Sequence, residues 1–137
     1  MRVIEGIELI ENIFEDINKL RKEGGYVSPD DSDLEQFFAN GKRMCAAGGA
    51  YGNSDKVSDI VDALMLGLGI TKNDYISASK WCHIRTQNKD DFFNDVVKFT
   101  RGLDEISEDK YILISGTNAI DCLEAGTGEV YVLVSLW

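Results

Sequence analysis

The chain has 137 residues, of which 44% are hydrophobic and 28% are charged, so its composition excludes wholesale disorder and allows one domain with a hydrophobic core. Its 24 acidic residues against 14 basic ones give a net charge of −10, which disfavours binding to nucleic acid or to an anionic membrane. We therefore predict a single domain over residues 1–137 that binds neither.

The N-terminus and the cysteines both favour a cytoplasmic protein. Glu5, Glu8 and Glu11 interrupt the apolar stretch that a signal peptide needs, and no apolar run approaches the ~20 residues of a membrane span. The three cysteines are odd in number and lack CxxC spacing, which favours free, buried thiols over a disulfide framework: Cys45, Cys82 and Cys122.

The first third of the chain predicts two helices. Residues 3–22 carry apolar side chains at helical spacing, and Gly24 lies just beyond them as a stop signal. A turn at Pro29 precedes a second helix, which either continues through Met44 and Cys45 or breaks near Gly41. Its first turn is crowded with acidic residues, where negative charge suits the helix dipole: Asp30, Asp31, Asp33 and Glu35.

The middle of the chain predicts a loop and two further helices. Gly48–Ser54 (GGAYGNS) is typical of a connecting loop, and Asn53 or Ser54 is placed to cap a helix over residues 55–70. Residues 71–88 fit either a strand or a short helix. A further helix begins at an Asn88 cap and ends at Gly102. The acidic residues early in this helix are Asp90, Asp91 and Asp95. Its apolar residues are expected on one side: Phe92, Phe93, Val96 and Val97.

The last third predicts strands. KYILISG forms a short strand, a turn follows at residues 116–118, and AIDCLEA and EVYVLVSLW form a hairpin around the GTG turn. The last run is apolar on both faces, which indicates a strand that is covered on both sides or flanked by other strands. Helices first and strands last predict an α+β fold, with N-terminal helices packed on a small C-terminal antiparallel sheet, a β-meander.

No motif in the sequence indicates catalysis, a metal site or a cofactor. His83, the only histidine, is adjacent to Cys82, but neighbouring residues on a strand or helix diverge too far to form a nucleophile pair. The run from Asp30 to Asp33 imitates the start of a calcium loop, yet the central glycine and the terminal glutamate are missing. We therefore predict a protein without catalytic residues, metal or cofactor.

The segment YILISGTNAIDCLEAGTGEVYVL, Tyr111 to Leu133, is similar to the sheet of the SUKH superfamily of bacterial toxin-immunity and related binding proteins. LEQFFANGKRMCAAGG resembles the helix and glycine turn near the start of such proteins. The chain departs from the family by lacking a leucine-proline pair before the second helix and a helix after the last strand. The resemblance implies an α+β fold, no enzymatic activity and an acidic surface that binds a partner.

These observations lead to one main hypothesis and several alternatives. The main hypothesis is an acidic protein that neutralises a basic partner, such as a toxin or nuclease domain, by occupying its cationic cleft. The predicted partner-binding residues are Asp30, Asp31, Asp33, Glu35, Asp90, Asp91 and Asp95. A phage-encoded inhibitor of a bacterial defence nuclease is the first alternative. A small enzyme or ligand-binding module that uses the Gly48–Gly52 loop with His83 or Cys82 is the second, and a structural subunit is the third.

Overall fold

The computed structural model describes residues 43–52, 55–104, 112–118 and 127–136, together with Glu15 and Ser32. Over these residues the elements follow the order β1 (Arg43–Gly52), α3 (Val57–Leu68), α4 (Lys72–Ser77), β2 (Ser79–Thr86), α5 (Lys89–Asp104), β3 (Ile112–Asn118) and β4 (Thr127–Leu136). Three predicted elements lie outside the described residues: the helix over residues 3–22, the helix after Pro29 and the strand over residues 119–125. The exceptions are Glu15 and Ser32, which are helical and exposed, and the start of β1. The single domain over residues 1–137 stays a prediction.

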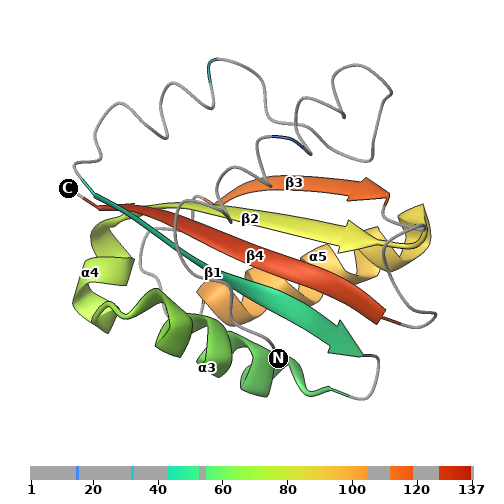
Figure 1. Cartoon of the computed structure of the whole chain (residues 1–137), viewed down its shortest axis with the longest axis horizontal. Coiled ribbons are helices and arrows are strands. Elements are labelled where there is room, and N and C mark those ends of the chain that lie inside the picture. Colours follow the sequence, from blue (N-terminus) through green and yellow to red (C-terminus); the bar gives the residue numbers. More distant parts are fainter. Residues whose placement is uncertain are drawn as a thin grey trace.

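The four strands form one mixed sheet in the order β1-β4-β2-β3. β4 runs antiparallel to both of its neighbours, with Ala47 opposite Val132 on one side and Cys82 opposite Val132 on the other. β2 and β3 are parallel, and α5 connects them. α3 and α5 lie on the same side of the sheet, and α4 lies toward one of its ends (Figure 1).

The predicted fold class is wrong in its arrangement. Strands occur throughout the described chain, since β1 and β2 precede α5, and one sheet edge is the parallel pair β2–β3 instead of an antiparallel meander. The turn predicted at residues 116–118 is also wrong, because β3 continues through them. Parallel strands need a long crossover connection, which is usually a helix. α5 is that connection between β2 and β3, whereas the prediction placed this helix before the sheet.

The glycine-rich stretch that was predicted as a loop is part of β1. Gly48 lies opposite Tyr131 of β4, and a Cβ atom at position 48 would come within 2.1 Å of Cδ1 of the Tyr131 ring. Glycine is therefore needed here because the tyrosine ring lies directly on the β1 backbone. Of the two alternatives for the second predicted helix, the continuation through Met44 and Cys45 is wrong, because the chain is extended from Arg43 onward.

The predictions for α3 and β4 are confirmed. Ile60, Val61, Leu64 and Leu68 of α3 are buried, as the apolar stripe predicted, although the N-cap residue is Lys56 and makes no side-chain cap bond. β4 is buried continuously from Val130 to Ser135 because β1 and β2 flank it on both sides. Residues 71–88 contain both of the alternatives left open, the short helix α4 and then β2.

α5 begins as predicted and ends two residues later than predicted. The side chain of Asn88 accepts a hydrogen bond from the backbone N–H of Asp91 at 2.8 Å, which caps the helix, and the helix runs past Gly102 to Asp104. The four apolar residues do not share one side. Phe92 is buried and Val96 is half-buried, whereas Phe93 and Val97 are 48% and 50% exposed.

The two faces of the sheet bury different side chains. The face toward α3 and α5 is apolar, and its strand residues in the main core cluster are Ala47, Tyr51, Cys82, Ile84, Val130, Val132 and Val134. The alternate strand residues point to the second face, which is also buried and includes Trp81, His83, Ser115, Tyr131 and Leu133. No helix among the described residues is long and apolar enough to span a membrane.

Candidate functional site

The second face of the sheet carries a buried polar network. The indole Nε1–H of Trp81 donates to Ser115 Oγ at 2.7 Å, and Nδ1 of His83 lies 2.6 Å from the same oxygen. A serine hydroxyl can accept from Trp81 while it donates to His83, so one side chain satisfies two rings. The His83 ring also stacks on Tyr131, with 6.3 Å between ring centroids.

A second group continues the network toward the start of β4, at Glu129. The hydroxyl of Tyr131 donates to Glu129 Oε2, and Glu129 Oε1 lies 3.2 Å from Nη1 of Arg85. Burial raises the pKa of the Tyr131 hydroxyl above its ordinary value, and its contact with the Glu129 carboxylate raises that pKa further. Tyr131 therefore stays protonated at neutral pH and acts as a hydrogen-bond donor.

These positions remove the Cys–His alternative. Cys82 belongs to the core cluster toward the helices, whereas His83 contacts Ser115 on the opposite face of the same strand. Burial raises the pKa of the Cys82 thiol to about 12, so this thiol does not ionise at neutral pH. The enzyme alternative also needed the Gly48–Gly52 loop, which is a strand. Among the described residues, no three His, Cys, Asp or Glu side chains are grouped so as to hold a metal ion.

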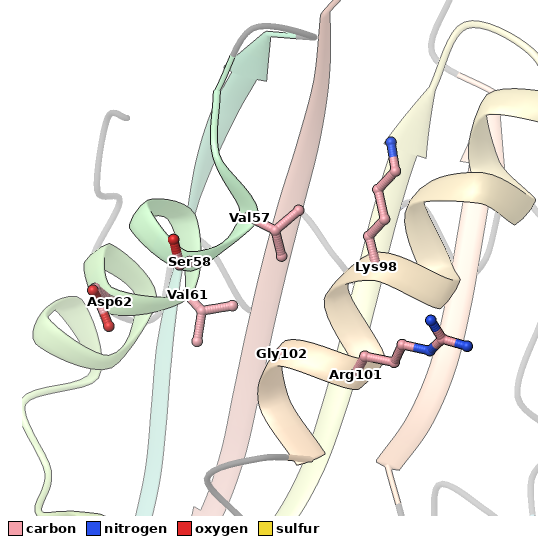
Figure 2. A pocket seen from close by; sticks show the side chains of 7 residues that line it. All are labelled: Val57, Ser58, Val61, Asp62, Lys98, Arg101 and Gly102. Carbon is pink, nitrogen blue, oxygen red and sulfur yellow. The ribbon is translucent and has the colours of Figure 1, made fainter.

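The surface of the helical layer is hollowed between α3 and α5. A groove of about 340 Å³ is lined by Val57, Ser58, Val61 and Asp62 of α3 and by Lys98, Arg101 and Gly102 of α5. Figure 2 shows Val57 and Val61 pointing from α3 toward α5, and Arg101 extending away from α3. The groove therefore has an apolar floor, an acidic side chain on one rim and two basic side chains on the other.

Gly102 determines how closely the two helices approach at this groove. A Cβ atom at position 102 would lie 2.8 Å from Cγ2 of Val61, closer than real Cβ contacts. The sequence prediction used Gly102 only as the end of the helix, whereas in the structure it lies within α5 and contacts α3. Lys98 and Arg101 were not predicted as site residues. Their three-residue spacing on a helix, in an otherwise acidic chain, was the signal that could have found them.

The predicted partner-binding acids occupy different environments. Asp30, Asp31, Asp33 and Glu35 lie outside the described residues. Asp90 and Asp91 are exposed in the first turn of α5, and Asp91 also accepts a hydrogen bond from Asn88. Asp95 points toward the sheet, where the hydroxyl of Tyr51 donates to its Oδ2 at 2.5 Å. Asp91 and Asp95 are one helical turn apart, and the charge of Asp91 raises the pKa of Asp95, whereas Asp90 lies on a different side of α5.

Comparison with known proteins finds relatives in structure only. No protein-family profile matches the chain, and no curated protein matches it. An FtsZ dimer from M. jannaschii superposes with a TM-score of 0.70 at 14% identity, over 93% of this chain and 37% of that one. The W319Y mutant of the same FtsZ gives 0.66 at 16% identity, over 93% and 38%. A GTPγS-form protofilament of TubZ from Bacillus thuringiensis serovar israelensis gives 0.50 at 12% identity, over 91% and 34%.

These neighbours share the fold of the chain, and the chain spans little more than a third of their length. The resemblance to the SUKH superfamily is wrong, because the neighbours have the fold of tubulin-like GTPases. The expectation of a non-enzymatic immunity protein or nuclease inhibitor with a basic toxin partner is contradicted by the same finding. The resemblance failed because a glycine turn between two apolar strands occurs in many unrelated sheets.

Proposed function

We propose that this chain is an assembly domain of a tubulin-like filament system, which binds a GTP-dependent filament of the FtsZ or TubZ type. The observation that carries the proposal is the superposition on FtsZ over 93% of the chain, with a TM-score of 0.70. The matching structures are a dimer and a protofilament, so this fold occurs in proteins that associate with copies of themselves.

The surface of the helical layer supports an assembly role. The groove between α3 and α5 combines an apolar floor with charged rims, and Phe93 and Val97 add exposed apolar area on α5. An apolar centre with a polar rim is the usual anatomy of a protein interface. We propose that the groove receives a segment of the filament subunit, and that the exposed Asp90 and Asp91 belong to the surrounding contact.

The proposal assigns the nucleotide to the partner filament. Phosphate binding of the P-loop kind needs a glycine-rich loop with free backbone N–H groups. The glycine-rich stretch Gly48–Gly52 instead pairs with β4 along its length. The proposal also places the protein in the cytoplasm, which is consistent with a free, buried Cys82.

A pelleting experiment tests the proposal. The purified chain is mixed with the FtsZ- or TubZ-type protein of the same cell in GTP or in GDP, and the filaments are sedimented. We expect the chain in the pellet only with GTP. Ser58→Trp fills the groove and should leave the chain in the supernatant. Leu66→Trp is the matched control, since Leu66 is 84% exposed on the same helix and does not line the groove. Equal recovery in GTP and GDP, or equal loss by both variants, would contradict the proposal.

A further inference from the structure

The outward face of α5 has a symmetric pattern of charge and apolar residues. Asp90, Phe93, Val97 and Arg101 are all exposed and follow one another at intervals of three or four residues, so they form one stripe along the helix. The stripe begins with an acid, ends with a base and carries its two large apolar residues in between. Phe93 and Val97 are about half exposed, and Phe93 contacts the ring of Phe92 at its base.

We infer that this stripe, from Asp90 through Phe93 and Val97 to Arg101, is a self-complementary docking surface on which a second copy of the chain binds, with the two α5 helices antiparallel. An antiparallel pair with two-fold symmetry places each residue opposite its mirror position on the partner helix. The two pairs of the stripe share nearly the same centre. The midpoint of Asp90 and Arg101 lies half a residue from the midpoint of Phe93 and Val97, which is less than about 1 Å along the helix.

One two-fold axis therefore satisfies both pairs. Phe93 of one copy lies opposite Val97 of the other, and Asp90 of one copy lies opposite Arg101 of the other, twice in each dimer. Charge complementarity identifies the occupant as a second copy, because a partner with a single sign of charge would leave one end of the stripe facing a like charge. Among the described residues, neither Asp90 nor Arg101 forms an ion pair within its own chain, so both are available for this contact.

The apolar pair supplies the centre of the interface and the charges fix the direction of the partner helix. The opposite face of α5 packs into the core through Phe92, Phe99 and Leu103. The exposed Phe93 and Val97, on adjacent turns, are therefore additional apolar surface that a partner could bury. The net charge of −10 on each copy opposes association at long range. This repulsion is screened at physiological ionic strength, where the Debye length is about 8 Å.

The inference goes beyond the proposed function, because it requires neither nucleotide nor a second protein, and it is tested on the chain alone. Sedimentation equilibrium of the full chain at about 150 mM salt, over a wide range of concentration, should show a reversible dimer. Arg101→Asp and Asp90→Arg each place like charges opposite one another at two symmetric points, and each should weaken the dimer about tenfold.

The double variant Asp90→Arg with Arg101→Asp decides the geometry. It exchanges the charges on both copies and should restore dimerisation to within about threefold of the original chain. Phe93→Ser should weaken the dimer without rescue by any charge change. Asp59→Arg is the matched control, because Asp59 is an exposed acid in the first turn of α3 and lies outside the stripe. Circular dichroism of each variant confirms that it is folded.

Three results would overturn the inference: a wild-type chain that is monomeric at every concentration, a double variant no tighter than the single variants, or an Asp59→Arg variant as weak as Asp90→Arg. These results are obtained on the chain alone. Filament binding is measured separately by the pelleting experiment, whose Ser58→Trp variant lies in the groove and outside the stripe.

Discussion

The two faces of the sheet are built from alternate residues of the same strands, yet they are stabilised in different ways. The face under α3 and α5 contains valine, isoleucine and alanine side chains, whose burial is favourable in almost any close-packed arrangement. The second face contains Trp81, His83, Ser115 and Tyr131, whose polar atoms must meet their partners at fixed distances. The first face is therefore specified mainly by hydrophobicity and volume, and the second by hydrogen-bond geometry.

Val132→Asp should have the largest effect, because it tests the apolar face at its centre. Val132 is 1% exposed and lies between β1 and β2. A buried carboxylate without a partner costs several kcal/mol, a large part of a total stability of about 5–15 kcal/mol. We expect the variant to be unfolded at room temperature by circular dichroism. Leu66→Asp is the control at an apolar residue that is 84% exposed on α3 and lies outside the α5 stripe, and it should melt close to the original chain. A folded Val132→Asp variant would contradict the assignment of the core.

Ser115→Ala should cost less and act on the other face. The change removes one oxygen and leaves Trp81 Nε1–H and His83 Nδ1 without their shared partner, which corresponds to about 1–3 kcal/mol. Urea denaturation measures the loss. Thr100→Ala serves as the control, since among the described residues the Thr100 hydroxyl donates to carbonyls of its own helix, those of Val96 and Val97. Equal losses for the two variants would mean that the network adds nothing to the second face.

Glu129→Gln should have a smaller effect on the same face. Glutamine keeps an acceptor for the Tyr131 hydroxyl but removes the charge that pairs with Arg85, and both side chains of this pair are about one-fifth exposed. Solvent screens the pair in part and glutamine still offers an acceptor to Arg85, so we expect a loss of about 1 kcal/mol in urea denaturation. The loss should shrink when salt is added. A loss that is independent of salt would show that Glu129 acts by packing and not by charge.

Asp95→Asn should have the smallest effect and a defined pH dependence. Burial raises the pKa of Asp95 above its ordinary value of 3.8, and the charge of Asp91 adds to this, while the Tyr51 hydrogen bond and Lys98 partly offset it. The folded state therefore holds the proton more tightly than the unfolded state. The resulting stabilisation is complete below pH 3.8 and is lost as pH rises through the folded pKa.

Asparagine does not titrate at this position. The stability of the original chain relative to Asp95→Asn should consequently be greatest in acid and should decline toward neutral pH, as measured by urea denaturation at a series of pH values. A relative stability that rises with pH would reverse the sign of the shift and contradict the burial of this carboxyl group.

The sequence predicted those elements in which the spacing of apolar residues along the chain matches the side of the element that is buried. Ile60, Leu64 and Leu68 repeat at helical spacing because one side of α3 faces the sheet, and the prediction of that helix is confirmed. β4 reads as apolar on both faces because it is central, and this prediction is also confirmed. In both cases local pattern and tertiary environment agree.

Elements whose burial depends on distant partners were missed. β1 contains alanines and glycines, and nothing local indicates that Gly48 lies beneath Tyr131, far away in the chain. For β2 the sequence left a strand and a short helix open, because Lys80, His83 and Arg85 interrupt any apolar period, although Lys80 and His83 are buried. The groove combines side chains from α3 and α5, so its position could not be inferred before the two helices were placed side by side.

The central position of β4 also determines when the fold can form. β1 and β2 are not adjacent in the sheet; each pairs with β4, which is the last of the four strands to be synthesised. Before residues 127–136 leave the ribosome, β1 has no sheet partner among the other three strands, and β2 can pair only with β3. Nascent chains of this protein should therefore expose unpaired edges of β1 and β2 and complete the sheet only after β4 is synthesised.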